Sequence, residues 1–269
     1  MRRQPRVRKR RASAARAAGG RRTRTDAPAT PPAFFDRLCA ALHKALDIDF
    51  SHYRPATIQR QFERHLAHAN ETDPEAYLSR LEQDPAEAQA LAEQLLLSVT
   101  DFFRHPYTFD DLQQHVFPVL AERMTSRTPV RIWVPGCSTG EEVYSLAIAF
   151  SEFCDRKHVG MYAQFFGTDL VEKNVEAARA GVYRDKVAAR LTGQRLGRFF
   201  EKTPEGLRVI KSLRDRCIFA CHDIAADPPF PNIDLLSCRN VLIYFDHAYQ
   251  DIALPMFHFS LRPGGFLML

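Results

Sequence analysis

The sequence has little of what marks a membrane protein, a disulfide-rich protein or a metalloprotein. No run approaches the roughly 20 apolar residues that a membrane-spanning helix needs, and the longest candidate, residues 143–150, is bounded by charged residues. The six cysteines include no CxxC pair and no spacing typical of zinc. Cys217, Cys221 and His222 lie close together, but their apolar neighbours favour a buried strand. We therefore expect a cytoplasmic protein with no metal ion.

Acidic residues are absent from the first 25 residues, which contain eleven arginines or lysines. The rest of the chain has 26 basic and 32 acidic residues, so its net charge is about −6, although the whole chain carries +5. We expect a folded body that does not bind nucleic acid, preceded by a disordered basic tail over residues 1–31. The tail has no apolar core like that of a signal peptide, although its composition also suits an organelle transit peptide.

A helical pattern extends from residue 32 to about residue 124. Apolar residues recur at helical spacing over residues 34–46 and again over residues 57–66. Asp-Pro pairs at residues 73–74 and 84–85 are typical of helix starts and precede two further apolar helical patterns. We predict a helical domain over residues 32–126.

The pattern changes after residue 126. Short β-rich runs at residues 130–134, 163–169, 216–220, 233–237 and 266–269 are separated in the first half by apolar helices at 143–153 and 171–180. Strands that alternate with helices predict an α/β fold with a doubly wound, Rossmann-like parallel sheet over residues 127–269. A ligand of such a sheet binds at the carboxyl ends of the strands, near the switch point.

The turn at residues 134–142 joins the first strand to its helix. Its glycines allow a ligand to approach the backbone, but it has neither the Lys-Ser/Thr of a P-loop nor the full GxGxxG spacing. Glu141 and Glu142 would repel a pyrophosphate and suit a cationic ligand such as S-adenosylmethionine. Equally, they favour a helix N-terminus without any ligand.

Two further acids follow strands. Asp169 closes the second strand, where a carboxylate accepts the ribose hydroxyls of an adenosine, and Asp223 follows a later strand, where adenine edges are read. Each alone would also serve as a helix cap. Acids at three successive strand ends favour adenosine binding.

The chain resembles the CheR-type chemotaxis receptor methyltransferases from about residue 34 to its end. The resemblance rests on the segments SVTDFFR (98–104), GCSTGEE (136–142), RAGVY (179–183) and SCRNVLIYFD (237–246). It implies a small all-α domain on a class I S-adenosylmethionine methyltransferase fold. By motif position it implies cofactor contacts from Thr100, Arg104, Glu141, Asp169, Asp223, Ile224, Arg239 and Asn240. Ser98 departs from the asparagine that is common in the family at that position.

The resemblance also implies that Arg104 and Tyr244 face the transferred methyl group. Methyl transfer to a glutamate carboxylate requires no general base, since the unperturbed pKa of glutamate is about 4.3. The sequence shows no Ser/His/Asp or Cys/His arrangement, in keeping with that chemistry. Without the resemblance, an Arg104–Asp101 ion pair and a core position for Tyr244 are the simpler interpretations.

The expected partner is a chemoreceptor helix or a related signalling protein. Arg54, Arg60 and Arg64 form a basic face that suits an acidic receptor helix, although a solvated helix face explains them too. We expect a monomer. In tether-dependent relatives a small β insertion docks a receptor peptide, and the corresponding residues 206–211 look only weakly strand-like.

Two rival functions remain open at this point. Residues 227–230 read DPPF, a motif of amino-methyltransferases that act on adenine or glutamine, but they precede a strand where that motif follows one. The chain also fits a cofactor-binding interaction module of a larger signalling protein. Residues 266–269 end the chain inside a strand, so we expect the C-terminal hairpin of the class I fold to be missing and the chain to be a fragment of low solubility.

Overall fold

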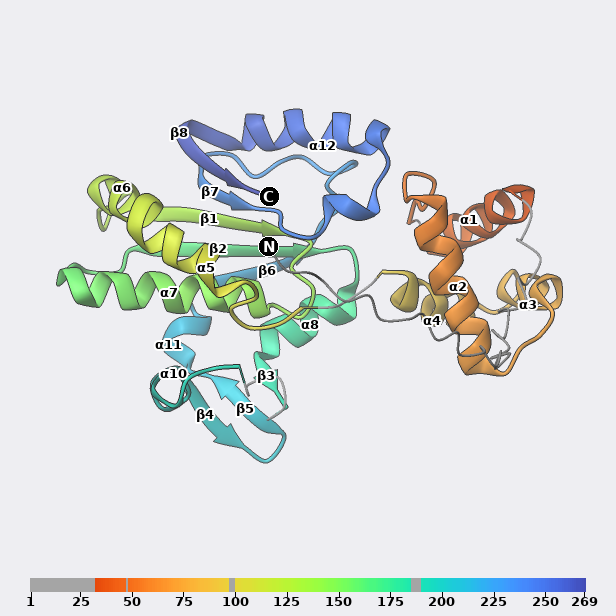
Figure 1. Cartoon of the computed structure of the whole chain (residues 1–269), viewed down its shortest axis with the longest axis horizontal. Coiled ribbons are helices and arrows are strands. Elements are labelled where there is room, and N and C mark those ends of the chain that lie inside the picture. The colour runs from red at the N-terminus through yellow and green to blue at the C-terminus, as the bar shows by residue number, and fades with distance from the viewer. Residues whose placement is uncertain (1–31, 47, 97–99, 185–189) are drawn as a thin grey trace, which may run out of the picture.

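A computed structural model describes residues 32–46, 48–96, 100–184 and 190–269. The predicted tail and Ser98 lie outside these residues. Figure 1 shows a group of helices beside a layered domain built on a parallel sheet, with a small antiparallel sheet at its lower edge. Among the described residues, no helix is both long and apolar enough to cross a membrane.

The helical domain consists of α1 (Pro32–Leu46), α2 (Pro55–Ala69), α3 (Pro74–Leu81) and α4 (Pro85–Leu95). Asp73 and Asp84 cap α3 and α4 by accepting hydrogen bonds from backbone N–H groups of the first turn. The apolar residues that predicted these helices form one core, with Leu38, Phe62 and Leu91 fully buried. The predicted all-α domain is therefore confirmed.

The main sheet contains β1 (Val130–Pro135), β2 (Ala163–Asp169), β6 (Cys217–Cys221), β7 (Ile233–Ser237) and β8 (Leu261–Met268). Its strands are all parallel and follow the order β6-β2-β1-β7-β8. The chain therefore reverses its direction of winding between β1 and β7, which confirms the doubly wound prediction. The β-rich run at residues 266–269 is the second half of a longer strand, and the register of β8 against β7 shifts between Ile233 and Leu235.

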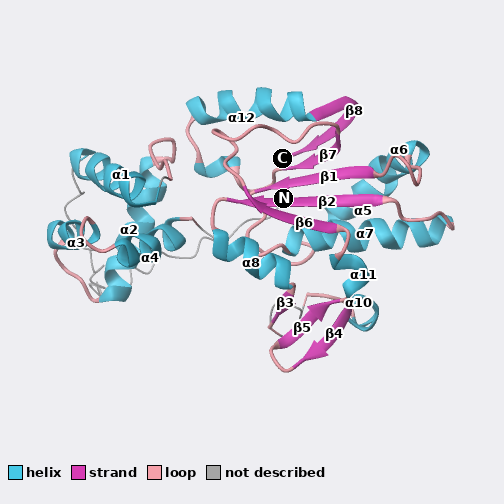
Figure 2. Cartoon of the chain, turned by 180° about the vertical axis from the view of Figure 1, so that it is seen from behind, coloured by secondary structure: helices cyan, strands magenta, loops and turns pink. Residues whose placement is uncertain are grey.

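Helices cover both faces of this sheet. Ile132 and Phe165 face α7 (Glu141–Lys157) in one core, whereas Trp133 and Phe166 share a second core with α12 (His247–Ser260) and the helical domain. Figure 2 shows α12 on one side of the strands and α7 with α8 (Glu172–Ala180) on the other. Because successive side chains of a strand point to opposite faces, this alternation along β1 and β2 gives the sheet one core on each face.

Three short helical segments, α5 (Pro106–Asp111), η1 (Leu112–Val116) and α6 (Phe117–Arg123), belong to the core of the sheet domain. Phe117, for example, lies 5.0 Å from Phe150 of α7 between ring centroids. We therefore propose that the domain boundary lies near residue 97, and that residues 100–126 belong to the sheet domain instead of the helical one. The domains also touch at Tyr53, which forms a β-bridge with Phe245.

A second sheet corrects the weak strand expectation for residues 206–211. β3 (Val182–Tyr183), β5 (Gly206–Val209) and β4 (Phe200–Thr203) form an antiparallel sheet with β5 in the centre, beside α10 (Gly193–Phe199) and α11 (Lys211–Arg214). Gly206 has φ +145°, and a Cβ there would lie 2.4 Å from the Tyr183 carbonyl oxygen. Only glycine fits this turn. β5 pairs along its whole length with β4, the strand directly before it, and over two residues with β3.

Candidate functional site

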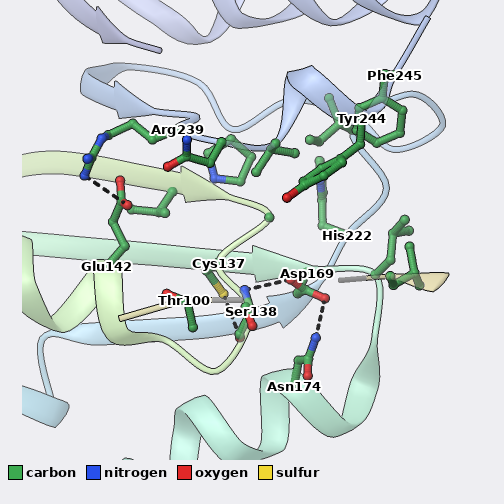
Figure 3. Close-up of a pocket in the computed structure, with 18 of the residues that line it drawn as sticks. Thr100, Cys137, Ser138, Glu142, Asp169, Asn174, His222, Arg239, Tyr244 and Phe245 are labelled. Carbon is green, nitrogen blue, oxygen red and sulfur yellow. Dashed lines mark hydrogen bonds and ion pairs between the residues drawn. The ribbon is translucent and has the colours of Figure 1, made fainter. Parts of the chain in front are cut away.

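A cleft lies at the carboxyl ends of β1, β2, β6 and β7, where the fold predicted a ligand. It holds about 1010 Å³ of empty space, part of it open to solvent. Its walls come from the strand ends, the end of α4 and the short 3-10 helix η2 (Leu242–Tyr244). Figure 3 shows Thr100, Asp169 and Tyr244 around the cavity. Among the predicted site residues, the lining includes Thr100, Arg104, Asp169, Ile224, Arg239, Asn240 and Tyr244.

The loop after β1 forms the floor of the cleft. Gly136 and Gly140 have φ of +65° and +93°, and a Cβ on Gly136 would lie 2.7 Å from Val241. The Cys137 N–H donates to the Thr168 carbonyl oxygen over 2.8 Å, which ties the loop to the end of β2. Glycine therefore allows the loop to pack closely against the segment that carries Asn240.

Asp169 holds this loop and faces the cleft. Its Oδ2 accepts a hydrogen bond from the Ser138 N–H over 2.7 Å, and its Oδ1 accepts from the Val171 N–H and from Asn174 Nδ2, each over 3.1 Å. Burial raises the pKa of Asp169, although these hydrogen bonds oppose the shift. An ionised carboxylate at this position has acceptor capacity left for a hydroxyl group.

The two glutamates of the turn point to different places. Glu142 lines the cleft and forms an ion pair with Arg239, with 3.3 Å between Oε2 and Nη1. Glu141 is 4% exposed, accepts a hydrogen bond from Thr139 Oγ1 over 2.6 Å and does not line the cleft. Burial raises the pKa of both carboxyls. The contact of Glu141 with a cofactor stays a prediction. Of the two glutamates, Glu142 is the one on the cleft lining, where a direct contact with a cofactor requires a side chain to be.

After β6, too, the neighbours of a predicted acidic residue line the cleft and the acidic residue itself does not. Ile224 and His222 line the cleft, but Asp223 does not. The Asp223 carboxylate accepts a hydrogen bond from the Ala225 N–H over 2.7 Å and so caps the following turn. His222 contacts the Pro228 carbonyl oxygen through Nε2 over 3.1 Å and packs edge-on against Trp133. The capping alternative thus has direct support at Asp223.

Aromatic and aliphatic residues that the sequence did not indicate complete the wall near β2 and β6. They come from the helical domain, from the loop after β2 and from the region after β7, and they are Tyr53, Leu95, Leu96, Leu170, Phe245 and Tyr249. Phe245 and Tyr249 stack with their ring centroids 4.0 Å apart. An apolar wall beside polar groups suits a flat heteroaromatic ring.

Arg104 and Tyr244 reach the same cleft from segments 140 residues apart in the sequence. Tyr244 is half-buried: it packs against the edge of the second core and also lines the cleft. Figure 3 shows its hydroxyl pointing into the cavity. Asp101 pairs with Arg190 over 3.1 Å. The Arg104 charge acts on Glu142 and lowers the pKa of that carboxyl, against the larger effect of burial.

The three arginines of the predicted basic face differ in their contacts. Arg60 and Arg64 are exposed on α2, and Arg64 contacts Gln61. Arg54, just before α2, donates from Nε to the Phe245 carbonyl oxygen over 2.9 Å, and its N–H donates to the Tyr244 carbonyl oxygen over 2.9 Å. Arg54 therefore also joins the two domains.

The DPPF segment takes part in packing. Phe230 lies 5.1 Å from Trp133 and 5.7 Å from Phe166 between ring centroids, and Asp227 accepts a hydrogen bond from the Asp223 N–H. No residue of the segment lines the cleft. Its place as an amino-methyltransferase motif has no support in this arrangement. In the part of the chain that the structure describes, no cluster of three metal-ligating side chains occurs.

Comparison with known proteins gives the same partition of the chain. The family described as CheR methyltransferase, all-alpha domain, matches residues 33–96, and CheR methyltransferase, SAM binding domain, matches residues 98–269. The chemotaxis protein methyltransferase of Salmonella typhimurium is 33% identical over 248 residues, covering 87% of this chain and 81% of the relative. Putative methyltransferase Cher3 of Pseudomonas putida is 33% identical over 240 residues, covering 86% and 85%.

A longer relative also matches. An uncharacterized 104.1 kDa protein of Rhodobacter capsulatus is 35% identical over 239 residues, which cover 89% of this chain and 25% of that protein. This chain thus spans about a quarter of that relative. The matches cover both domains, and the larger match exceeds half of the chain. The chain belongs to the CheR methyltransferase family, and its larger domain is an S-adenosylmethionine-binding domain.

Proposed function

We propose that this chain transfers a methyl group from S-adenosylmethionine to glutamate side chains of chemoreceptors or related signalling proteins. The observation that carries the proposal is a cleft with two kinds of charge. The carboxyl groups of Asp169 and Glu142, when ionised, suit the hydroxyl groups and the cationic groups of the cofactor. Arg104 is a cation in the same cleft, and it suits a carboxylate substrate.

The lining fits each part of the cofactor. Asp169 would accept the ribose hydroxyls, Ile224 and the apolar wall would enclose the adenine, and Glu142 would face the methionine ammonium group. Thr100 and Asn240 lie on the same lining and would complete the contacts. Asp223 and Glu141 would act indirectly, by shaping the turns that carry Ile224 and Glu142.

The reaction depends on alignment of the substrate carboxylate with the methyl group and needs no proton transfer. When bound, the cofactor would supply an electrophilic methyl group. A glutamate oxygen would bond to the methyl carbon as the carbon–sulfur bond breaks, and the electron pair of that broken bond would stay on sulfur. The substrate carboxylate is already ionised at neutral pH. Arg104 would hold it by charge-assisted hydrogen bonds, and Tyr244 would orient it through its hydroxyl. Alignment of this kind contributes up to about 7–11 kcal/mol in well-oriented systems.

Arg60 and Arg64 on α2 would meet the acidic face of a receptor helix, with Arg54 at the end of that face nearest the cleft. Long-range attraction between such faces speeds encounter and weakens with salt. We propose a cytoplasmic location, because relatives are named for the chemotaxis system, and we keep the expectation of a monomer as a proposal.

The test is transfer of tritiated methyl groups to a purified receptor cytoplasmic fragment. We expect label that alkali releases as volatile methanol, since glutamate methyl esters are base-labile and N-methyl groups are not. A receptor whose methylation-site glutamates are changed to alanine is the control, and DNA is the rival substrate. Alkali-stable label, or label on DNA, would refute the proposal. Cofactor binding without transfer to any receptor would favour the interaction module.

A further inference from the structure

Arg104 occupies a backbone segment of unusual geometry. Its neighbours Phe103 and His105 have φ of +51° and +58°, so two non-glycine residues in the left-handed region flank it. Side chains with a Cβ rarely adopt this region, and a bulky residue such as phenylalanine least of all. Such conformations persist where surrounding contacts hold them, and they concentrate at functional sites.

Contacts on one side hold Phe103. Its N–H donates to Ser145 Oγ over 2.9 Å, and the fully buried Ser145 donates in turn to the Glu141 carbonyl oxygen over 2.6 Å. The Phe103 ring packs against Phe109 at 4.8 Å, and the Arg195 guanidinium lies 3.7 Å from the ring centroid. These contacts fix the start of the segment to α7.

Arg239 holds the other side. Its Nη2 donates to the Arg104 carbonyl oxygen over 2.7 Å and lies 3.0 Å from His105 Nδ1. A guanidinium group has only donors, so Nδ1 accepts in this contact. The Arg239 side chain is 5% exposed. One buried arginine therefore contacts the backbone of Arg104 and the side chain of the next residue.

Glu142 fixes Arg239 in turn. Its Oε2 lies 3.3 Å from Arg239 Nη1, and its Oε1 accepts a hydrogen bond from the Ser237 hydroxyl at the end of β7. Figure 3 shows the Glu142–Arg239 pair at the edge of the cavity. A buried ion pair is a poor source of stability, but it specifies one geometry for the groups that it joins.

We propose that Arg239 and Glu142 are positioning residues for the methyl transfer: together they set the backbone of Arg104 and so aim its guanidinium group at the substrate carboxylate. This inference rests on the proposed function. It gives Arg239 a role distinct from cofactor binding, because its guanidinium group reaches the Arg104 and His105 segment. Small displacements of an aligned group are costly, since about 1 Å is enough to slow an enzyme 100-fold.

The experiment compares Arg239→Lys with Arg195→Lys in the full chain. Lysine keeps a positive charge beside Glu142 but loses the planar guanidinium that contacts Glu142, the Arg104 carbonyl oxygen and His105 Nδ1 at once. We expect Arg239→Lys to lower kcat about 10- to 100-fold at saturating cofactor, with S-adenosylhomocysteine affinity within threefold of wild type. Arg195→Lys alters the same segment from its other side, away from the cleft, and should leave kcat within threefold. If the Arg239 variant fails to fold, Glu142→Gln should show the same kcat loss at saturating cofactor, together with weaker cofactor binding because Glu142 also faces the methionine ammonium group.

A double-variant cycle shows whether Arg239 acts through Arg104. In an Arg104→Ala background, Arg239→Lys should cost less than threefold in residual kcat, because the side chain that it aims is gone. Equal losses in both backgrounds, or an unchanged kcat in Arg239→Lys, would overturn the inference. So would a loss confined to cofactor affinity, which would make Arg239 a binding residue. Wild-type turnover on receptor is measured first, so failure of the proposed function is seen separately.

Discussion

Replacement of Asp169 by alanine offers a direct test of the cofactor site. The carboxylate lies at the end of β2 and already accepts three hydrogen bonds, from the Ser138 and Val171 N–H groups and from Asn174. Its remaining lone pairs face the cleft. A hydrogen bond to a charged acceptor contributes about 1.5–3 kcal/mol, so loss of the ribose contact should weaken S-adenosylhomocysteine binding by about 10- to 150-fold.

The same change has a second, separable cost. Ser138 and Val171 are buried, and their N–H groups lose their acceptor, at about 1–3 kcal/mol for each donor that water does not reach. Removing a carboxyl whose pKa burial has raised offsets part of this loss. Calorimetric titration gives the affinity, and urea denaturation of the ligand-free variant gives the free energy of unfolding.

Asp223→Ala is the matched control. Asp223 was predicted beside Asp169 as an adenosine contact, but its carboxylate caps the turn at Ala225 and does not line the cleft. We expect its S-adenosylhomocysteine affinity to stay within threefold of wild type. A folded Asp169→Ala variant with wild-type affinity would refute the ribose assignment, and an Asp223→Ala variant with the larger loss would reverse the order of the two residues.

Three further predictions concern the reaction, the stability and the substrate. Tyr244→Phe should lower kcat, measured by steady-state kinetics, with little change in cofactor affinity, measured by calorimetry. Weaker cofactor binding with an unchanged kcat would instead make Tyr244 a binding residue. Burial raises the pKa of Glu141, so the native state binds its proton more tightly and loses stability as pH rises from about 4.3 through the raised pKa. Glu141→Gln lacks this loss, so urea denaturation should show a larger gain over wild type at pH 8 than at pH 5. Changing Arg60 and Arg64 together to alanine should raise KM for the receptor and flatten its salt dependence, whereas the exposed Arg37→Ala should do neither.

The sequence predicted the features that depend on local pattern. Strands over residues 130–134, 163–169 and 233–237 have continuous β-rich runs, and all three occur in the sheet. Asp169 could be placed at the cleft because it ends a parallel strand, and ligands of such sheets bind at the carboxyl ends of the strands. Loops after parallel strands meet at one edge, so motif residues as distant as Arg104 and Asn240 could be expected in one site.

Features that depend on a distant partner were beyond the sequence. Glu141 and Glu142 are adjacent on one helix turn, and only the position of Ser237 and Arg239 across the cleft selects Glu142 for the lining. Asp223 has the spacing of an adenine contact, yet a backbone N–H two residues later takes its carboxylate. Tyr53 lines the cleft from the helical domain, where no local pattern distinguishes it from a core residue.

The contacts of Arg54 connect recognition with reaction. Arg54 directly precedes α2, the helix with the exposed Arg60 and Arg64, and both its N–H and its Nε donate to carbonyl oxygens of Tyr244 and Phe245. A receptor helix held along α2 would therefore lie next to the tyrosine that faces the cofactor cleft. The helical domain then does more than attract an acidic partner. Because Arg54 donates a hydrogen bond to the backbone of Tyr244, the surface proposed to bind the substrate and the group proposed to orient it are fixed to each other.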